Sequence, residues 1–133
     1  MTLPYEQERR EFVRVRLQIP VRYKFLSKVR TGAAMDDVYE GATTNLGGGG
    51  LLLLGRIPVV DWIPELLMQK IVIGVNLLLP HDEAPIKALT RVAWVETFDE
   101  TTMKCNLGLK FKEITQADKD RIFKYVIKVQ MPS

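Results

Sequence analysis

The chain of 133 residues has the length of one domain, and its 47% hydrophobic and 26% charged residues are ordinary for a soluble globular protein. A single cysteine, Cys105, excludes an internal disulfide, and no apolar run approaches the ~20 residues needed to span a membrane. We therefore expect a cytoplasmic protein without a membrane span. Residues 1–30 hold 8 Lys/Arg against 3 Asp/Glu, so the positive charge lies at the N-terminus and predicts a small anionic ligand there.

The first twelve residues show no apolar period, and we expect residues 1–12 to form a flexible arm. From residue 13 onward apolar and polar side chains alternate as far as Phe25, which predicts a strand over 13–26 with one buried face. Pro20 lies inside this strand. Because proline has no N–H for the ladder, it predicts an edge position or a bulge.

The middle of the chain contains four consecutive glycines, residues 47–50, between short apolar runs. Strands are expected at 38–45 and 51–54, after a loop over 27–37. The glycines predict a turn in which the backbone takes unusual dihedral angles or another group approaches closely.

Residues 56–70 are predicted to contain a short helix, because Pro64 suits a first helical turn. Four apolar residues of this segment, Trp62, Ile63, Leu66 and Leu67, favour a lid over the core. If they are exposed instead, they form a patch for self-association into a homo-oligomer or for a partner.

Three more strands are expected at 71–79, 86–96 and 103–111, and alternation in the last places Cys105 on its buried face. Thr115 and Asp118 then resemble a capping box ahead of an amphipathic helix, whose apolar stripe runs from Ile122 to Ile127. About six strands with short turns and one helix predict a mainly β protein. We expect a six-stranded antiparallel β-barrel with a C-terminal helix, as one domain over 13–130.

The chain offers little for catalysis, since it has one histidine, no metal-ligand spacing and a cysteine predicted to be buried. We expect that the protein is not an enzyme and that it holds no metal and no cofactor. Arginines before the first strand and the glycine turn remain. Arginine binds phosphate bidentately and pairs with guanine, and a glycine turn lets N–H groups converge on an anion. With Asn45 ahead of the glycines, these groups predict a small guanine-containing phosphate ligand.

The sequence resembles the PilZ domain, a bacterial receptor module for cyclic di-GMP. The family's RxxxR motif is matched by Arg10 to Arg14, and its (D/N)xSxxG motif by Asn45 to Gly50. Further matches, in order, are Val92 and Trp94, the segment Gly108-Leu109-Lys110-Phe111, Ile114, Asp118 and Arg121. The resemblance covers roughly residues 8–128.

This resemblance implies that Arg10 and Arg14 surround the guanines and phosphates of cyclic di-GMP, while Asn45 and Gly50 contact it from the second motif. Arg9 adds charge beside them. Gly47 stands where the family has serine, so a hydroxyl donor is absent. Its loss is worth about 1.5–3 kcal/mol. Because each bidentate arginine–guanine contact is worth about 1–3 kcal/mol, we expect binding to survive, weakened about tenfold or more.

The leading hypothesis is a bacterial signal-transduction adaptor whose arm orders over the barrel when cyclic di-GMP binds, so that an effector protein reads the new surface. The alternative is a PilZ-type adaptor that no longer binds nucleotide and uses only protein contacts. A third class, a barrel for single-stranded nucleic acid, would place aromatic residues among the basic ones. Tyr23 and Phe25 fall on the apolar face instead, so we expect no nucleic-acid partner.

Overall fold

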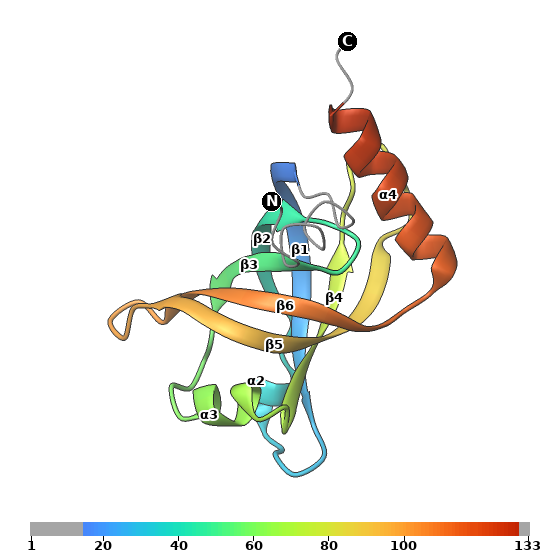
Figure 1. Cartoon of the computed structure of the whole chain (residues 1–133). Helices are drawn as coiled ribbons and strands as arrows, with labels where there is room; N and C mark the ends of the chain where they lie inside the picture. Colours follow the sequence, from blue (N-terminus) through green and yellow to red (C-terminus); the bar gives the residue numbers. More distant parts are fainter. Residues whose placement is uncertain (1–14, 131–133) are drawn as a thin grey trace, which may run out of the picture.

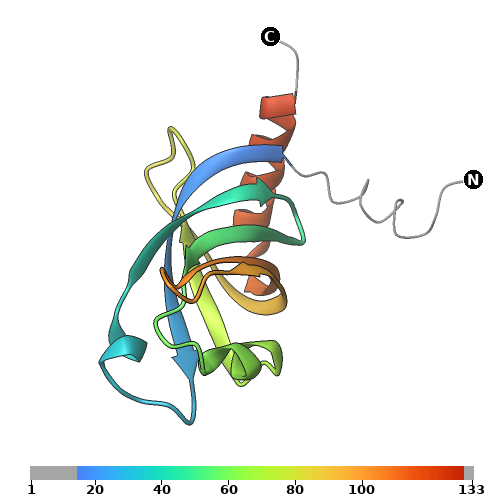
Figure 2. The same ribbon diagram turned by 90° about the vertical axis from the view of Figure 1, so that its left-hand side faces the viewer.

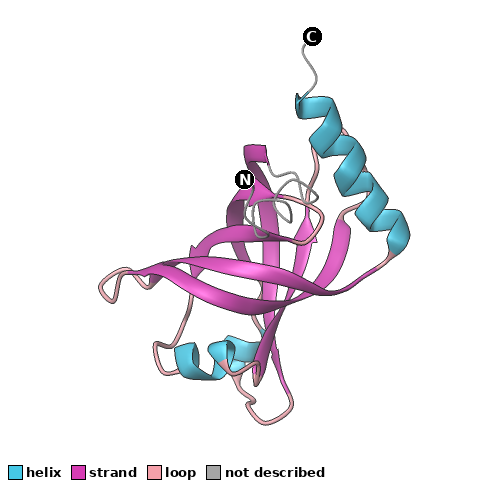
Figure 3. Cartoon of the chain, viewed as in Figure 1, coloured by secondary structure: helices cyan, strands magenta, loops and turns pink. Residues whose placement is uncertain are grey.

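The protein is a closed β-barrel with a helix at its C-terminal end, seen in a computed structural model that describes residues 15–130 (Figure 1, Figure 3). The strands are β1 (Val15–Ser27), β2 (Tyr39–Leu46), β3 (Gly50–Arg56), β4 (Ile71–Leu77), β5 (Ile86–Phe98) and β6 (Lys104–Ile114). The helices are α2 (Ala33–Asp36), α3 (Trp62–Leu67) and α4 (Gln116–Gln130). Every neighbouring pair is antiparallel, in the order β1-β2-β3-β6-β5-β4 around the barrel. The predicted fold class is confirmed. The predicted arm, residues 1–12, lies outside the described residues.

Strand β1 is the long strand that the alternation predicted. Ile19, Val21, Tyr23 and Phe25 are buried, while Arg22 faces solvent. A register shift lies between Arg16 and Ile19. Pairing with β4 begins only at Val21, and the carbonyl of Pro20 accepts a hydrogen bond from the N–H of Leu78, beyond the end of β4. The missing N–H of Pro20 therefore removes no bond from the ladder with β4.

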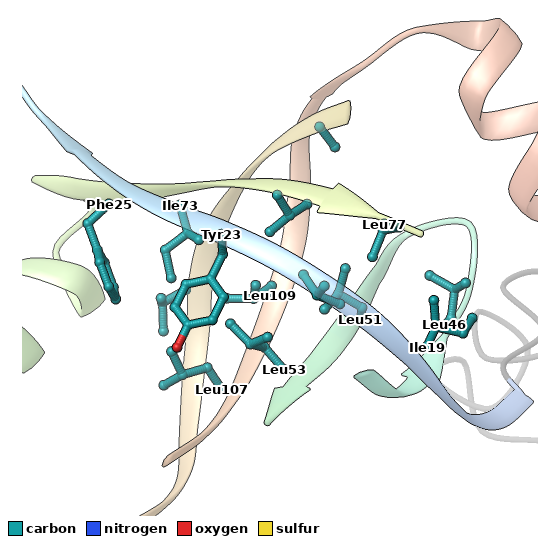
Figure 4. Packing of buried hydrophobic residues seen from close by; sticks show 14 of the residues in the cluster. Ile19, Tyr23, Phe25, Leu46, Leu51, Leu53, Ile73, Leu77, Leu107 and Leu109 are labelled. Atoms are coloured by element: carbon teal, nitrogen blue, oxygen red, sulfur yellow. The ribbon is translucent and has the colours of Figure 1, made fainter. Parts of the chain in front are cut away.

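The barrel interior is filled by aliphatic side chains from all six strands and by the aromatic rings of Tyr23 and Phe25 (Figure 4). The hydroxyl of Tyr23 donates to the carbonyl of Arg56 (2.9 Å) and accepts from its N–H (2.7 Å). Gly55 makes this arrangement possible, because a Cβ there would lie 2.5 Å from that hydroxyl. The buried hydroxyl of Tyr23 thus has both a donor and an acceptor as partners.

Helices α2 and α3 lie at one end of the barrel, and α4 reaches the other (Figure 1, Figure 2). Trp62 and Leu66 of α3 are buried, and Trp62 meets Phe25 edge-on with ring centroids 5.1 Å apart. The lid prediction is confirmed for these two residues. Leu67 is different, with 46% of its surface exposed. The predicted loop over 27–37 contains the short helix α2, which the sequence reading missed; buried Met35 anchors it.

Helix α4 begins as the capping pattern predicted, with the hydroxyl of Thr115 accepting from the N–H of Asp118 at 3.1 Å. The carboxylate of Asp118 pairs with Arg121 (3.0 Å). Ile122 and Val126 are buried against the barrel, but Ile127 is 56% exposed, so the predicted apolar stripe is wrong at its last residue. One residue is about 100° around a helix, which turns Ile127 away from the barrel. Within residues 15–130 no helix is long and apolar enough to cross a membrane.

Candidate functional site

The four glycines close the connection between β2 and β3 (Figure 1). The N–H of Gly47 donates to the carbonyl of Gly50 at 3.1 Å, and the carbonyl of Gly49 accepts from the N–H of Phe111 at 3.0 Å. Just before the turn, the hydroxyl of Thr43 donates to the carbonyl of Asn45 at 2.6 Å. The turn is therefore held by backbone hydrogen bonds to β3 and β6.

At two of the four glycines, Gly48 and Gly50, another part of the protein lies too close for a side chain. A Cβ on Gly48 would lie 2.5 Å from the ring of Phe123 in α4, and a Cβ on Gly50 would overlap the carbonyl of Leu109. Unusual dihedral angles do not explain these glycines. Among the described glycines, a positive φ occurs at Gly32, which lies outside this turn. Of the two explanations that the sequence left open, the structure supports the close approach of other groups, and it packs α4 directly on the turn.

The strand register places five residues in one line across the barrel. Arg16 on β1 pairs with Asn45 on β2, and Asn45 pairs with Leu52 on β3. Leu52 in turn pairs with Gly108 on β6, and Gly108 pairs with Trp94 on β5. We call this line the Asn45–Trp94 row.

The Asn45–Trp94 row lies on the outer face of the barrel. Leu51 and Leu53 flank it on β3 and point into the core, as do Leu107 and Leu109 on β6. Successive side chains of a strand point to opposite faces, so Asn45, Leu52 and Trp94 face outward. Three interstrand steps of about 4.8 Å separate Asn45 from Trp94, about 14 Å along the surface.

Trp94 supplies the flat apolar part of this surface. A Cβ on Gly108 would overlap the indole, so the ring lies directly over Gly108, and 39% of Trp94 is exposed. The sequence-based site did not include Trp94. In strict alternation it would share the buried face of Thr90 and Val92, but a bulge between Val92 and Trp94 turns it outward. An aromatic residue in a strand gives no sign of such a bulge.

The predicted site residues divide into two groups. Asn45, Gly47 and Gly50 lie together at the end of β2 and the start of β3. Arg9, Arg10 and Arg14 lie outside the described residues. The chain that carries them enters the barrel at Val15, which pairs with Leu46, the residue between Asn45 and the glycine turn.

The titratable groups of the interior are held in their neutral forms. Burial raises the pKa of Cys105 to about 11 and that of Tyr23 to about 12. Between residues 15 and 130, no three or more His, Cys, Asp or Glu side chains gather in a way that could hold a metal ion.

A closed six-stranded barrel with a glycine turn and a helix packed on it is the architecture of a PilZ-type domain. The family model of the PilZ domain matches residues 8–128, and the chain belongs to this family. The comparison with curated proteins gave no match.

Solved structures with the same fold include the Bacillus subtilis inhibitor of motility MotI/DgrA (TM-score 0.65, 18% identity), with 92% of this chain and 51% of that one aligned. The PilZ domain of YcgR from Escherichia coli, solved with c-di-GMP, aligns over 92% of both chains (TM-score 0.57, 9% identity). The MrkH–c-di-GMP complex of K. pneumoniae aligns over 91% of this chain and 51% of its own (TM-score 0.61, 18% identity). This chain thus spans about half the length of MotI/DgrA and of MrkH.

Proposed function

We propose that this protein is a cyclic di-GMP receptor that acts as an adaptor. One observation carries the proposal: the register brings Asn45, the glycine turn and the point where β1 enters onto one outer surface. Membership of the PilZ family and the cyclic di-GMP in the YcgR and MrkH structures support it. We infer binding without catalysis, in a bacterial cytoplasm.

In this proposal the arginines supply most of the affinity. Arg10 and Arg14 hold the guanines and phosphates, with Arg9 adding charge, and Asn45 and Gly50 contact the ligand from the turn. The missing hydroxyl at Gly47 is not replaced by that residue's own N–H, which is already bonded to Gly50.

Trp94 offers a second source of affinity. Its exposed indole lies in the same row as Asn45 and has the flat apolar surface on which a guanine stacks. Stacking of a base on an aromatic side chain is worth about 1–3 kcal/mol, which is comparable with the about 1.5–3 kcal/mol lost with the hydroxyl. The missing hydroxyl still weakens binding about tenfold or more, and stacking on Trp94 adds to the affinity that remains.

The signal would pass outward through the arm. Residues 1–14 order over the barrel when the ligand neutralises their arginines, and an effector protein then reads the changed surface. Calorimetric titration with cyclic di-GMP tests whether the protein binds this ligand. GTP and cyclic di-AMP are the specificity controls.

The matched variants are Arg14→Ala and Arg22→Ala, because both arginines occupy even positions of the alternating segment, eight residues apart. The receptor proposal is supported if the wild type binds cyclic di-GMP selectively, Arg14→Ala abolishes this binding and Arg22→Ala retains it. No heat of binding at about 100 μM cyclic di-GMP overturns it. Trp94→Ala is expected to weaken binding by about tenfold, whereas full affinity in this variant removes stacking from the proposal.

A second candidate function is an adaptor that does not bind nucleotide. Gly47 favours it, as do the exposed Leu67 (46%) and Met68 (58%) at the end of α3. The same titration decides, because this adaptor gives no heat with any of the three nucleotides.

A further inference from the structure

A groove of about 650 Å³ lies on the outer face of β1, β4 and β5, with its far wall at the junction of β6 and α4. It involves the second half of β1 and the first half of β5, so it is separate from the Asn45–Trp94 row. Gly74, in the middle of β4, lines the hollow and has no side chain to fill it. Gly74 pairs with Lys24 on one side and with Leu89 on the other.

The fold does not require a glycine at position 74. A Cβ there would lie 3.5 Å from Leu26 and 4.0 Å from the carbonyl of Lys24, which are ordinary contact distances, and its φ is not positive. Gly48, Gly50 and Gly108 differ, because a Cβ at each would clash. A glycine inside a strand also costs stability. What Gly74 does provide is the open groove.

Positive charge lines both sides of the groove. Arg22 on β1 and Lys87 on β5 flank Asn76 in a single register row, with Lys24 one row away. Within residues 15–130, neither Lys24 nor Lys87 forms an ion pair, and Arg22 has only a 3.7 Å contact with an exposed carboxylate, which contributes little. These cations are available to an acidic partner.

The floor of the groove is apolar, and its far wall carries Ile114 beside the carboxylate of Glu113. Leu26 is 40% exposed, and Leu89 and Ile114 are partly exposed beside it. The barrel is closed, so it has no free strand edge to which a partner could add a strand. The strands that carry the cations, β1 and β5, are two interstrand steps apart, about 10 Å, which is close to the diameter of an α-helix.

We propose that this groove binds an amphipathic helix of a partner protein, with an apolar face toward Leu26, Leu89 and Ile114 and with acidic residues on both flanks toward Arg22 and Lys87. It is the helix-in-groove mode of recognition. Under the proposed function, this groove is the surface that contacts the effector protein. The groove proposal itself does not depend on nucleotide binding.

Nucleic acid fits the groove less well. The one aromatic residue in its lining, Tyr23, is 2% exposed and offers no ring on which a base could stack. An acidic helix needs no ring for stacking.

The test uses the full chain without nucleotide and a fluorescein-labelled designed helical peptide of about 18 residues, with leucines at the i, i+3, i+4 and i+7 positions and glutamates on the flanks. A second peptide carries lysine in place of every glutamate. Fluorescence anisotropy is expected to show saturable binding of the acidic peptide and at least tenfold weaker binding of the basic one. Equal binding of the two peptides, or no saturation with the acidic peptide at about 500 μM protein, overturns the proposal.

Variants then locate the binding site. Gly74→Leu fills the groove and is expected to weaken binding of the acidic peptide at least tenfold. Urea unfolding checks that this variant is folded. Lys24→Glu is expected to act in the same direction through charge alone. Lys104→Glu, at the distant end of β6, is the matched control and keeps wild-type affinity. Binding that both Gly74→Leu and Lys24→Glu leave intact refutes the groove, whatever the nucleotide titration shows.

Discussion

The hydroxyl of Tyr23 makes two hydrogen bonds to the backbone of Arg56 inside the barrel, and Tyr23→Phe removes both while leaving the ring in place. Each such bond contributes about 1 kcal/mol net, and an abandoned donor or acceptor costs about 1–3 kcal/mol when water cannot reach it. Arg56 lies near the surface, so we expect Tyr23→Phe to lower the free energy of unfolding by about 2 kcal/mol at pH 8.

The pH dependence of this difference isolates Tyr23. Burial raises its pKa in the folded protein to about 12, above the value of 10.0 for an exposed tyrosine. The stability linked to this proton is fully present below pH 10 and is lost as the pH rises through 12, because only the unfolded chain releases the proton in that window. At pH 11 the wild type loses about 1.4 kcal/mol in this way and Tyr23→Phe loses nothing, so the difference falls to about 0.6 kcal/mol.

Urea unfolding of both proteins at pH 8 and pH 11, followed by circular dichroism, measures the two differences. Cys105, whose pKa burial raises to about 11, titrates in both proteins. A difference that stays constant between the two pH values would refute the buried, protonated state of Tyr23. A difference below about 0.5 kcal/mol at pH 8 would refute the role of its hydrogen bonds.

Three further predictions concern the site and α4. Gly48→Ala forces the turn away from Phe123 and is expected to cost about 1–3 kcal/mol of unfolding free energy in urea, whereas unchanged stability contradicts the packing of α4 on the turn. Gly108→Ala displaces the indole of Trp94 and is expected to shift its fluorescence emission, with an identical spectrum counting against the stacked geometry. Arg121→Gln removes two ion pairs at the start of α4 and is expected to speed amide hydrogen exchange there; equal protection shows that these pairs do not hold the helix.

Much of the fold follows from local pattern. Alternation along β1 depends only on which residues avoid water, so Ile19, Val21, Tyr23 and Phe25 could be assigned to the core without knowledge of their neighbours. The start of α4 was also readable, since Thr115 caps the helix through its own hydroxyl. In the candidate site, Asn45 and the glycine turn were predicted, and Arg9, Arg10 and Arg14 stay predictions.

Tertiary structure decided the features that depend on partners distant in the sequence. Trp94 faces outward only because β5 bulges against β6, which no pattern within β5 reveals. Ile127 was assigned to the buried stripe but faces solvent, because the barrel covers only part of the helix surface. The glycines look alike as letters, yet Gly48 makes room for α4 and Gly74 makes room for nothing in the fold. Side-chain periodicity thus determined the elements of this protein, and strand register and packing decided which of its surfaces remain open.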